Sequence, residues 1–124
     1  MDEAFIKKVQ PNSPEAEQSV IGAMIMDRDA IADVIDIVNA DDFYQKQNGI
    51  LFEAMTELYR EGKPVDLVTL QNKLKKKDVP ESMKSLEFIR DLLEAVPTSA
   101  NAKQYAKIVS EKAKVTYRSG TLLM

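Results

Sequence analysis

The chain has 124 residues, of which 44% are hydrophobic and 30% are charged, and this is typical of one globular domain with a real core. Its net charge of −3 argues against a surface built to bind DNA or RNA. It contains no cysteine and no histidine, which excludes disulfides and Ser-His-Asp and Cys-His nucleophiles and argues against an ordinary zinc site.

Residues 1–12 are predicted to form a short tail. This tail lacks the apolar run of a signal peptide, and no stretch of the chain is apolar for long enough to span a bilayer. The sequence therefore predicts a cytoplasmic protein without membrane association.

A helix beginning at Pro14 is expected to be the centre of the fold. Ser13 is a suitable N-cap, and Glu15 and Glu17 suit the positive end of the helix dipole. No side chain in this helix is placed to do chemistry. Apolar residues cover most of its girth, which is typical of a buried helix. These residues are Ala16, Val20, Ile21, Ala23, Met24 and Ile25.

Three further helices are predicted over residues 30–77. The first is capped by Asp29 and ends at Asn39, and its apolar residues recur with helical spacing. Phe43 and Tyr44 follow it and are expected to plug the core from a loop. A strongly apolar helix then runs over residues 50–59 and ends at Gly62. Asp66 caps the next helix, whose last turns carry Lys73, Lys75, Lys76 and Lys77.

Two helices complete the predicted fold. One covers residues 86–96 and is stopped by Pro97; the other is capped by Thr98 or Ser99 and ends at Gly120. The apolar side of the last helix consists of Ala102, Tyr105, Ala106, Val109 and Ala113. The fold class is therefore all-α, a compact orthogonal bundle of about six helices. We divide the chain into a tail (1–12), a globular helical head (13–97) and a C-terminal helix with its tail (98–124).

The sequence offers no catalytic, cofactor-binding or metal-binding residue. The pair Gly62-Lys63 is followed by Pro64, and Glu57 stands where a phosphate-binding loop needs its first glycine. Neighbouring aspartates are explained by helix capping and by solvent exposure. The lysines at 73–77 lack interleaved aromatic residues and arginines, so a solvated helix end is favoured over a nucleic-acid patch.

Six motifs occur in the order and at the spacing of a known family. This chain resembles the N-terminal domain of the bacterial DnaB-type replicative DNA helicases over residues 11–112. The motifs are PEAEQSVIGAM (14–24), DFY (42–44), ILFEAM (50–55), GKPVDLVTL (62–70), PTSANA (97–102) and YAKIVSEK (105–112).

The resemblance implies a non-catalytic role for this chain. In this family the ATP- and magnesium-dependent motor that contacts DNA is a separate domain, which this sequence lacks. The N-terminal domains pair through a helical hairpin, and three pairs form a collar on the hexamer. This collar docks the primase C-terminal domain, and a helicase loader can contact it.

The last helix corresponds to the first arm of that hairpin, over residues 100–115. Apolar residues off its main face favour association with another chain. The predicted partner-binding residues are Tyr105, Ile108, Val109, Lys112 and Val115. For Tyr105 and Val109, closure of the core is an equally weighted alternative.

Two departures from the family pattern leave alternatives open. Residues 81–85 read ESMKS where the family commonly has Gly-Gly, and no second hairpin arm follows Lys112. The chain is therefore either a fragment of a helicase or a free-standing collar mimic that regulates primase or helicase loading. A helical module that binds single-stranded DNA through Lys73 to Lys77 is a further alternative.

Overall fold

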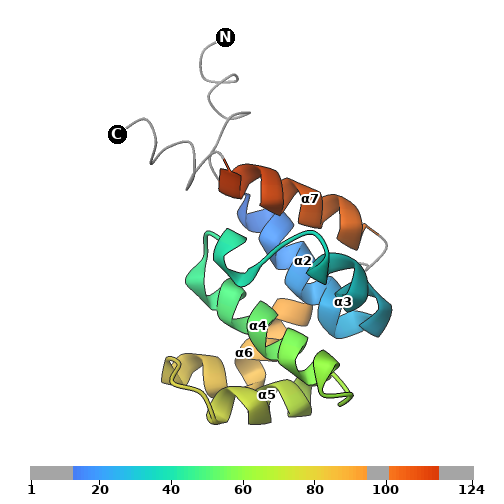
Figure 1. Cartoon of the computed structure of the whole chain (residues 1–124). Coiled ribbons are helices and arrows are strands. Elements are labelled where there is room, and N and C mark those ends of the chain that lie inside the picture. Colours follow the sequence, from blue (N-terminus) through green and yellow to red (C-terminus); the bar gives the residue numbers. More distant parts are fainter. Residues whose placement is uncertain (1–12, 95–100, 115–124) are drawn as a thin grey trace.

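The computed structural model describes residues 13–94 and 101–114. Over these residues the fold is all-helical, with six α-helices, two 3₁₀ helices and no strand, which confirms the predicted fold class (Figure 1). In chain order the elements are α2 (Pro14–Met26), α3 (Arg28–Ile35), η1 (Ala40–Asp42), α4 (Lys46–Arg60), α5 (Leu67–Lys75), η2 (Glu81–Lys84), α6 (Leu86–Glu94) and α7 (Ala102–Ala113).

Helix α2 is the centre of the bundle, as predicted. It packs against α3, α4, α6 and most extensively α7, and Val20, Ile21 and Met24 are fully buried. Each large apolar side chain buried in this way stabilises the fold by about 1.5–3 kcal/mol. Ser13 caps the helix, because its Oγ accepts a hydrogen bond from the Ala16 amide at 3.2 Å.

The other helices lie on two sides of α2. Figure 1 shows α7 crossing one end of the molecule beside α2 and α3, while α5 and α6 lie at the opposite end below α4. Helix α4 contacts both groups, since it packs on α2, α3 and α5. In the described part of the chain, no helix is both long and apolar enough to cross a membrane.

Several predicted helix ends were wrong. The N-cap of α3 is Asp27, whose carboxylate accepts from the Asp29 amide at 2.9 Å. One residue thus ends α2 and caps α3, so no separate cap at Asp29 is needed. Helix α3 ends at Ile35 rather than Asn39, and the Asn39 amide instead donates to the Asp42 carboxylate at 2.9 Å, which closes η1.

The ends of α4 and α7 also differ from the prediction. Helix α4 begins at Lys46, about one turn before the predicted start at Ile50. Residues 46–49 form this additional turn. The N-cap position of α7 is Asn101; the predicted caps Thr98 and Ser99 lie outside the described residues, as does the predicted end at Gly120.

The aromatic pair before α4 separates into two environments. Phe43 is 4% exposed and its ring centroid lies 5.4 Å from that of Phe52, so it plugs the core as predicted. Tyr44 is 49% exposed, and the prediction that it plugs the core was wrong. The backbone at Tyr44 is instead held in place by a side chain from α2, as described below.

The connection from α4 to α5 is capped at both ends. Gly62 adopts φ +74°, which allows the chain to leave α4 and the Lys63 amide to donate to the Leu58 carbonyl at 3.0 Å. Asp66 caps α5, accepting from the Thr69 amide at 2.9 Å. Both roles were predicted.

Arg28 holds this connection from outside. Its guanidinium donates to the carbonyls of Lys63 at 2.6 Å and Tyr59 at 3.3 Å, and it lies 4.7 Å from the centre of the Tyr59 ring. A residue in the first turn of α3 therefore binds one carbonyl in the last turn of α4 and one in the connection that follows it.

Candidate protein-binding surface

The predicted partner-binding residues occupy three different environments on α7. Val109 is 2% exposed and belongs to the core together with Ala102, Ala106 and Ala113. Tyr105 and Ile108 are half-buried and pack against that core, and Lys112 is half-buried as well. Val115 lies outside the described residues. The burial of Val109 favours core closure for that residue, whereas the partner role of the others stays a prediction.

Tyr105, Ile108 and Lys112 form one stripe along α7. Their spacings of three and four residues place them on the same side of the helix, next to the buried line. The stripe is apolar over its first two positions and basic at the third. We refer to these three residues as the α7 stripe.

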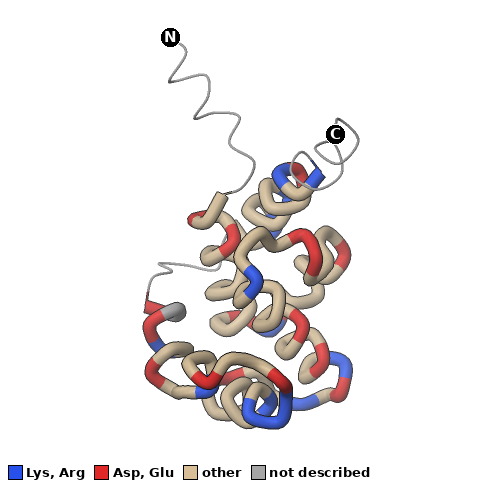
Figure 2. Tube along the Cα trace, turned by 90° about the vertical axis from the view of Figure 1, so that its left-hand side faces the viewer, with Lys and Arg blue, Asp and Glu red and all other residues tan. Residues whose placement is uncertain are grey.

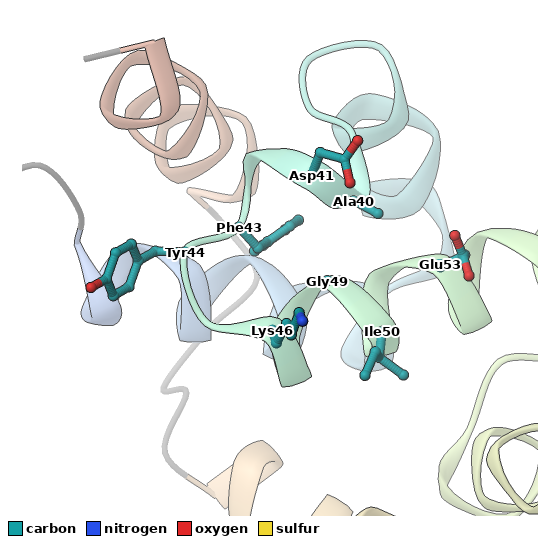
Figure 3. A pocket seen from close by; sticks show the side chains of 8 residues that line it. All are labelled: Ala40, Asp41, Phe43, Tyr44, Lys46, Gly49, Ile50 and Glu53. Carbon is teal, nitrogen blue, oxygen red and sulfur yellow. The ribbon is translucent and has the colours of Figure 1, made fainter. Parts of the chain in front are cut away.

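A hollow of about 600 Å³ lies between η1 and the first half of α4 (Figure 3). In Figure 3, Asp41 lies on the η1 side, and Lys46, Ile50 and Glu53 follow α4 along the other side. The residues that line the hollow are Ala40, Asp41, Phe43, Tyr44, Lys46, Gly49, Ile50 and Glu53.

Gly49 allows η1 to lie this close to α4. A Cβ atom at this position would be only 2.7 Å from the carbonyl oxygen of Ala40. Because that neighbour is backbone, it cannot turn aside as a side chain would. The close approach of η1 to α4, which shapes the hollow, therefore requires glycine at position 49.

The hollow continues along α4 into a second one of about 300 Å³. Both are lined by Ala40 and Glu53, and the second also reaches Ile35, Glu57 and Arg60. Together they form a surface groove, which we call the η1–α4 groove. Its lining combines the apolar residues Phe43 and Ile50 with the acidic Asp41 and Glu53 and the basic Lys46 and Arg60.

Glu17 fixes the start of α4 against α2. Its side chain is buried, and the residue is only 2% exposed. The carboxylate accepts from the amides of Tyr44 at 2.7 Å and Gln45 at 3.1 Å, and from Asn48 Nδ2 at 3.1 Å. The sequence predicted that Glu17 suits the positive end of its own helix dipole. The structure adds a second role, because the carboxylate also binds amide donors at the start of α4.

The lysines of α5 are used within the fold. Lys73 Nζ lies 2.9 Å from Glu61 and 3.4 Å from Glu57, and Lys77 Nζ lies 3.0 Å from Glu57 and 3.7 Å from Glu53. Glu53 and Glu57 on α4 and Glu61 at its C-cap are spaced four residues apart. They face Lys73 in the last turn of α5 and Lys77 just after that helix. Figure 2 shows blue and red segments close together at the end of the molecule where these helices lie.

The ion pair between Glu61 and Lys73 shifts both groups. The hydrogen bond from Lys73 is the main cause that holds the pKa of Glu61 below its ordinary value of 4.5. The bond to Glu61 likewise raises the pKa of Lys73 above 10.5. Because Lys73 and Lys77 are paired with carboxylates, only part of the predicted basic run is available to a nucleic acid.

The acidic pairs singled out in the sequence are not arranged as a metal centre. Asp27 and Asp42 bind backbone amides, and Asp33 and Asp36 are exposed on α3 and its C-cap. Among the residues that the structure describes, no group of three or more His, Cys, Asp or Glu side chains is placed to hold a metal ion. The surface features with shape and charge are therefore the groove and the α7 stripe.

Comparison with known proteins decides the family. The sequence profile described as DnaB-like helicase N terminal domain matches residues 9–111. The chain belongs to this family. The match is to the non-catalytic N-terminal domain of the DnaB-type helicase.

Replicative helicases of several bacteria are similar to this DnaB-type domain. DnaB of Geobacillus stearothermophilus is 38% identical over 113 residues, which are 91% of this chain and 25% of that protein. DnaB of Mycobacterium leprae is 39% identical over 103 residues, which are 83% of this chain and 17% of that protein. The chain thus spans a quarter or less of the length of these relatives.

Two solved structures share the DnaB-type fold. The N-terminal domain of DnaB helicase from Mycobacterium tuberculosis superposes with a TM-score of 0.83 at 36% identity, covering 92% of this chain and 84% of that one. The N-terminal domain of DnaB helicase from Helicobacter pylori, described with its interactions with primase, superposes with a TM-score of 0.73 at 21% identity, covering 97% and 90%. The second likeness is one of fold alone.

Proposed function

We propose that this chain serves DNA replication as the accessory N-terminal domain of a replicative helicase and that it acts by binding proteins. Its partners in this proposal are other helicase subunits in an N-terminal collar and the C-terminal domain of primase. The observation that carries the proposal is the family match over residues 9–111. The domain from Helicobacter pylori, which has the same fold, interacts with primase.

The described surface supports protein binding. It combines the half-buried α7 stripe with a groove that both apolar and charged residues line. Partner sites commonly have an apolar centre and a polar rim. A helicase loader is a further proposed partner, and the cytoplasm, where bacterial DNA is replicated, is the proposed location. We expect the isolated chain to need neither ATP nor magnesium, which serve the motor domain of the family.

The test is a calorimetric titration of the primase C-terminal domain from the same organism into this chain, with the mass of the chain measured first by light scattering. We expect binding at about micromolar affinity, which is about −8 kcal/mol. Replacing an apolar residue of the α7 stripe, Ile108→Gln, should weaken the binding by about tenfold, because it removes an apolar contact. The matched control is Lys107→Gln, an exposed neighbour outside the stripe.

Each outcome of the titration decides a part of the proposal. Absence of binding by a monomeric chain would show that the primase site needs a paired hairpin, which contradicts a site on the described residues. Absence of binding by a dimeric chain would contradict the primase role itself. Equal loss in both variants would place the contact elsewhere than on the α7 stripe.

The free-standing collar mimic remains a second candidate from the sequence. It makes the same predictions for the isolated chain as the helicase domain does. The coding region downstream of Met124 separates the two, because only a helicase continues into a motor domain with a phosphate-binding loop.

A further inference from the structure

A small hollow of about 210 Å³ lies where α2 and α4 begin. It is lined by Pro14, Gln18, Gln45, Gln47 and Asn48, and it shares no lining residue with the η1–α4 groove. Apart from the proline, every lining side chain ends in a carboxamide, which both donates and accepts hydrogen bonds. We call this feature the amide hollow.

Asn48 brings a buried oxygen to the amide hollow. The residue is 4% exposed, and its Nδ2 donates to Glu17 Oε1 at 3.1 Å. Because a carboxylate can only accept, the amide nitrogen must face Glu17 and Oδ1 faces away from it. None of the residues that the structure describes donates to this Oδ1. A buried acceptor without a donor is costly, so the position suits a ligand that supplies one.

The first turn of α4 offers donors in the same place. The amides of Asn48 and Gly49 donate to the Gln45 carbonyl at 3.0 Å and 3.3 Å, but the Gln45 side chain makes no cap hydrogen bond. Within the described part of the chain, the backbone amides of Lys46 and Gln47 have no acceptor, as is usual where a helix begins. A ligand in the hollow can therefore accept from a backbone amide and donate to Asn48.

The charges around the amide hollow favour a neutral ligand. The positive ends of the α2 and α4 dipoles lie at the hollow and disfavour a cation. The buried carboxylate of Glu17 and the exposed carboxylate of Glu15, which follows Pro14 in the chain, disfavour an anion. An uncharged group that carries both a donor and an acceptor avoids both penalties.

We propose that the amide hollow binds a primary carboxamide, the group that ends the side chains of glutamine and asparagine. Its N–H donates to Asn48 Oδ1, and its oxygen accepts from a backbone amide at the start of α4. The glutamines of the lining complement the remaining donor and acceptor positions of the group. The carboxamide belongs either to free glutamine or to a side chain of a protein, and these two sources share the chemistry of recognition.

Three small probes of similar shape test this preference. The chain, labelled with a nitrogen isotope, is titrated with propanamide, propanoate and propylammonium and followed by nuclear magnetic resonance. We expect propanamide to shift the side-chain amide signals of Asn48 and the backbone signals of Lys46 and Gln47 in a saturable way, at about millimolar affinity because the probe is small. The two ions should bind at least about tenfold more weakly, since each meets charge of its own sign.

Variants of the lining test whether the signals report this site. Gln18→Leu and Gln47→Leu remove a carboxamide at similar side-chain size, and each should weaken propanamide binding about threefold to tenfold. The matched control is Gln104→Leu at an exposed position of α7, which should leave the binding unchanged. Circular dichroism of every variant establishes that it is folded.

A second pair of probes separates the two sources of the carboxamide. Free glutamine is compared with the capped peptide acetyl-Gly-Gln-Gly N-methylamide and with its Gly-Leu-Gly counterpart. Tighter binding of the glutamine peptide than of free glutamine supports a protein side chain as the ligand, whereas the reverse order supports free glutamine. Equal binding of the glutamine and leucine peptides would overturn the site, because it would show that the side-chain carboxamide is not recognised.

The remaining outcomes are equally decisive. Saturable shifts with propanamide that the two lining variants weaken support the proposal. Absence of these shifts overturns it, as does equal binding of propanamide and either ion. The site does not depend on the proposed function, so a failure here leaves the primase titration and its conclusion unaffected.

Discussion

At the scale of single residues, Glu17 joins α2, the segment before α4 and α4 itself. It lies on α2, and its carboxylate accepts hydrogen bonds from two backbone amides before α4 and from the side chain of Asn48 within α4. A buried carboxylate is stable only where such donors surround it. The same contact holds the backbone of Tyr44 at one end of the η1–α4 groove.

Removing this carboxylate should destabilise the whole domain. We expect Glu17→Ala to lower the free energy of unfolding by about 3 kcal/mol, because it leaves buried donors without an acceptor. The control is Glu15→Ala, an exposed glutamate in the same helical turn, which should change it by less than about 0.5 kcal/mol. Urea denaturation measures both. Equal losses would mean that Glu17 acts only through the dipole of its helix.

At the scale of elements, α4 and α5 form an antiparallel pair closed by a short connection. Gly62, the Asp66 cap and Arg28 fix the connection, and the glutamates and lysines pair across the open side. Such exposed pairs contribute little individually. Their shared spacing of four residues nevertheless aligns the two helices in one register.

The ion pair of Glu61 and Lys73 predicts a dependence on pH. Because the pKa of Glu61 is lowered in the folded protein, the pair stabilises the fold fully above about pH 4.5, and this contribution is lost as the pH falls through the lowered value. It is lost again as the pH rises through the raised pKa of Lys73 above 10.5. Urea denaturation from pH 3 to 8 should therefore show that Glu61→Gln lowers stability near neutral pH and that this difference disappears in acid.

The control for this prediction is Glu87→Gln on α6, an exposed glutamate outside the α4–α5 pairing. It should not reproduce the difference between neutral and acidic pH. If Glu61→Gln leaves the stability curve parallel to that of the unaltered chain, then the pair does not contribute in solution.

The features that could be predicted from the sequence are those that a local pattern determines, such as helix caps and a buried helix. Ser13, Gly62 and Asp66 act on their own helices, and each was placed correctly, as was the central helix α2, most of which is buried. Glu17, Arg28 and Lys73 act on residues that lie 12 to 35 positions away in the sequence, and no local spacing encodes such contacts. The groove was missed for the same reason, because η1 and α4 approach each other only through the absent side chain of Gly49.

At the scale of the whole molecule, α7 and α2 share one core. Ala106 is fully buried, and α7 contacts α2 and α3 along its length. The division between a head and a separate C-terminal helix stays a prediction for the connecting residues 95–100, which lie outside the described chain. Where α7 is described, it packs as a part of the bundle.

This packing predicts one cooperative unfolding transition. Ala106→Leu should destabilise the domain by about 2 kcal/mol, because the larger side chain does not fit between α7 and α2. Thermal unfolding followed by circular dichroism should show a single transition at a lower temperature, whereas Lys107→Leu on the exposed side should shift it little. A second, earlier transition in Ala106→Leu would show that α7 detaches independently.

The first turn of α2 and the last turn of α7 lie at the same end of the molecule in Figure 1. The opposite end, formed by α5 and α6, is remote from both. We expect that a fluorophore attached at residue 13 or 114 leaves the α5–α6 end free for attachment to a surface. The η1–α4 groove, which lies between the two ends, then remains accessible to partners in solution.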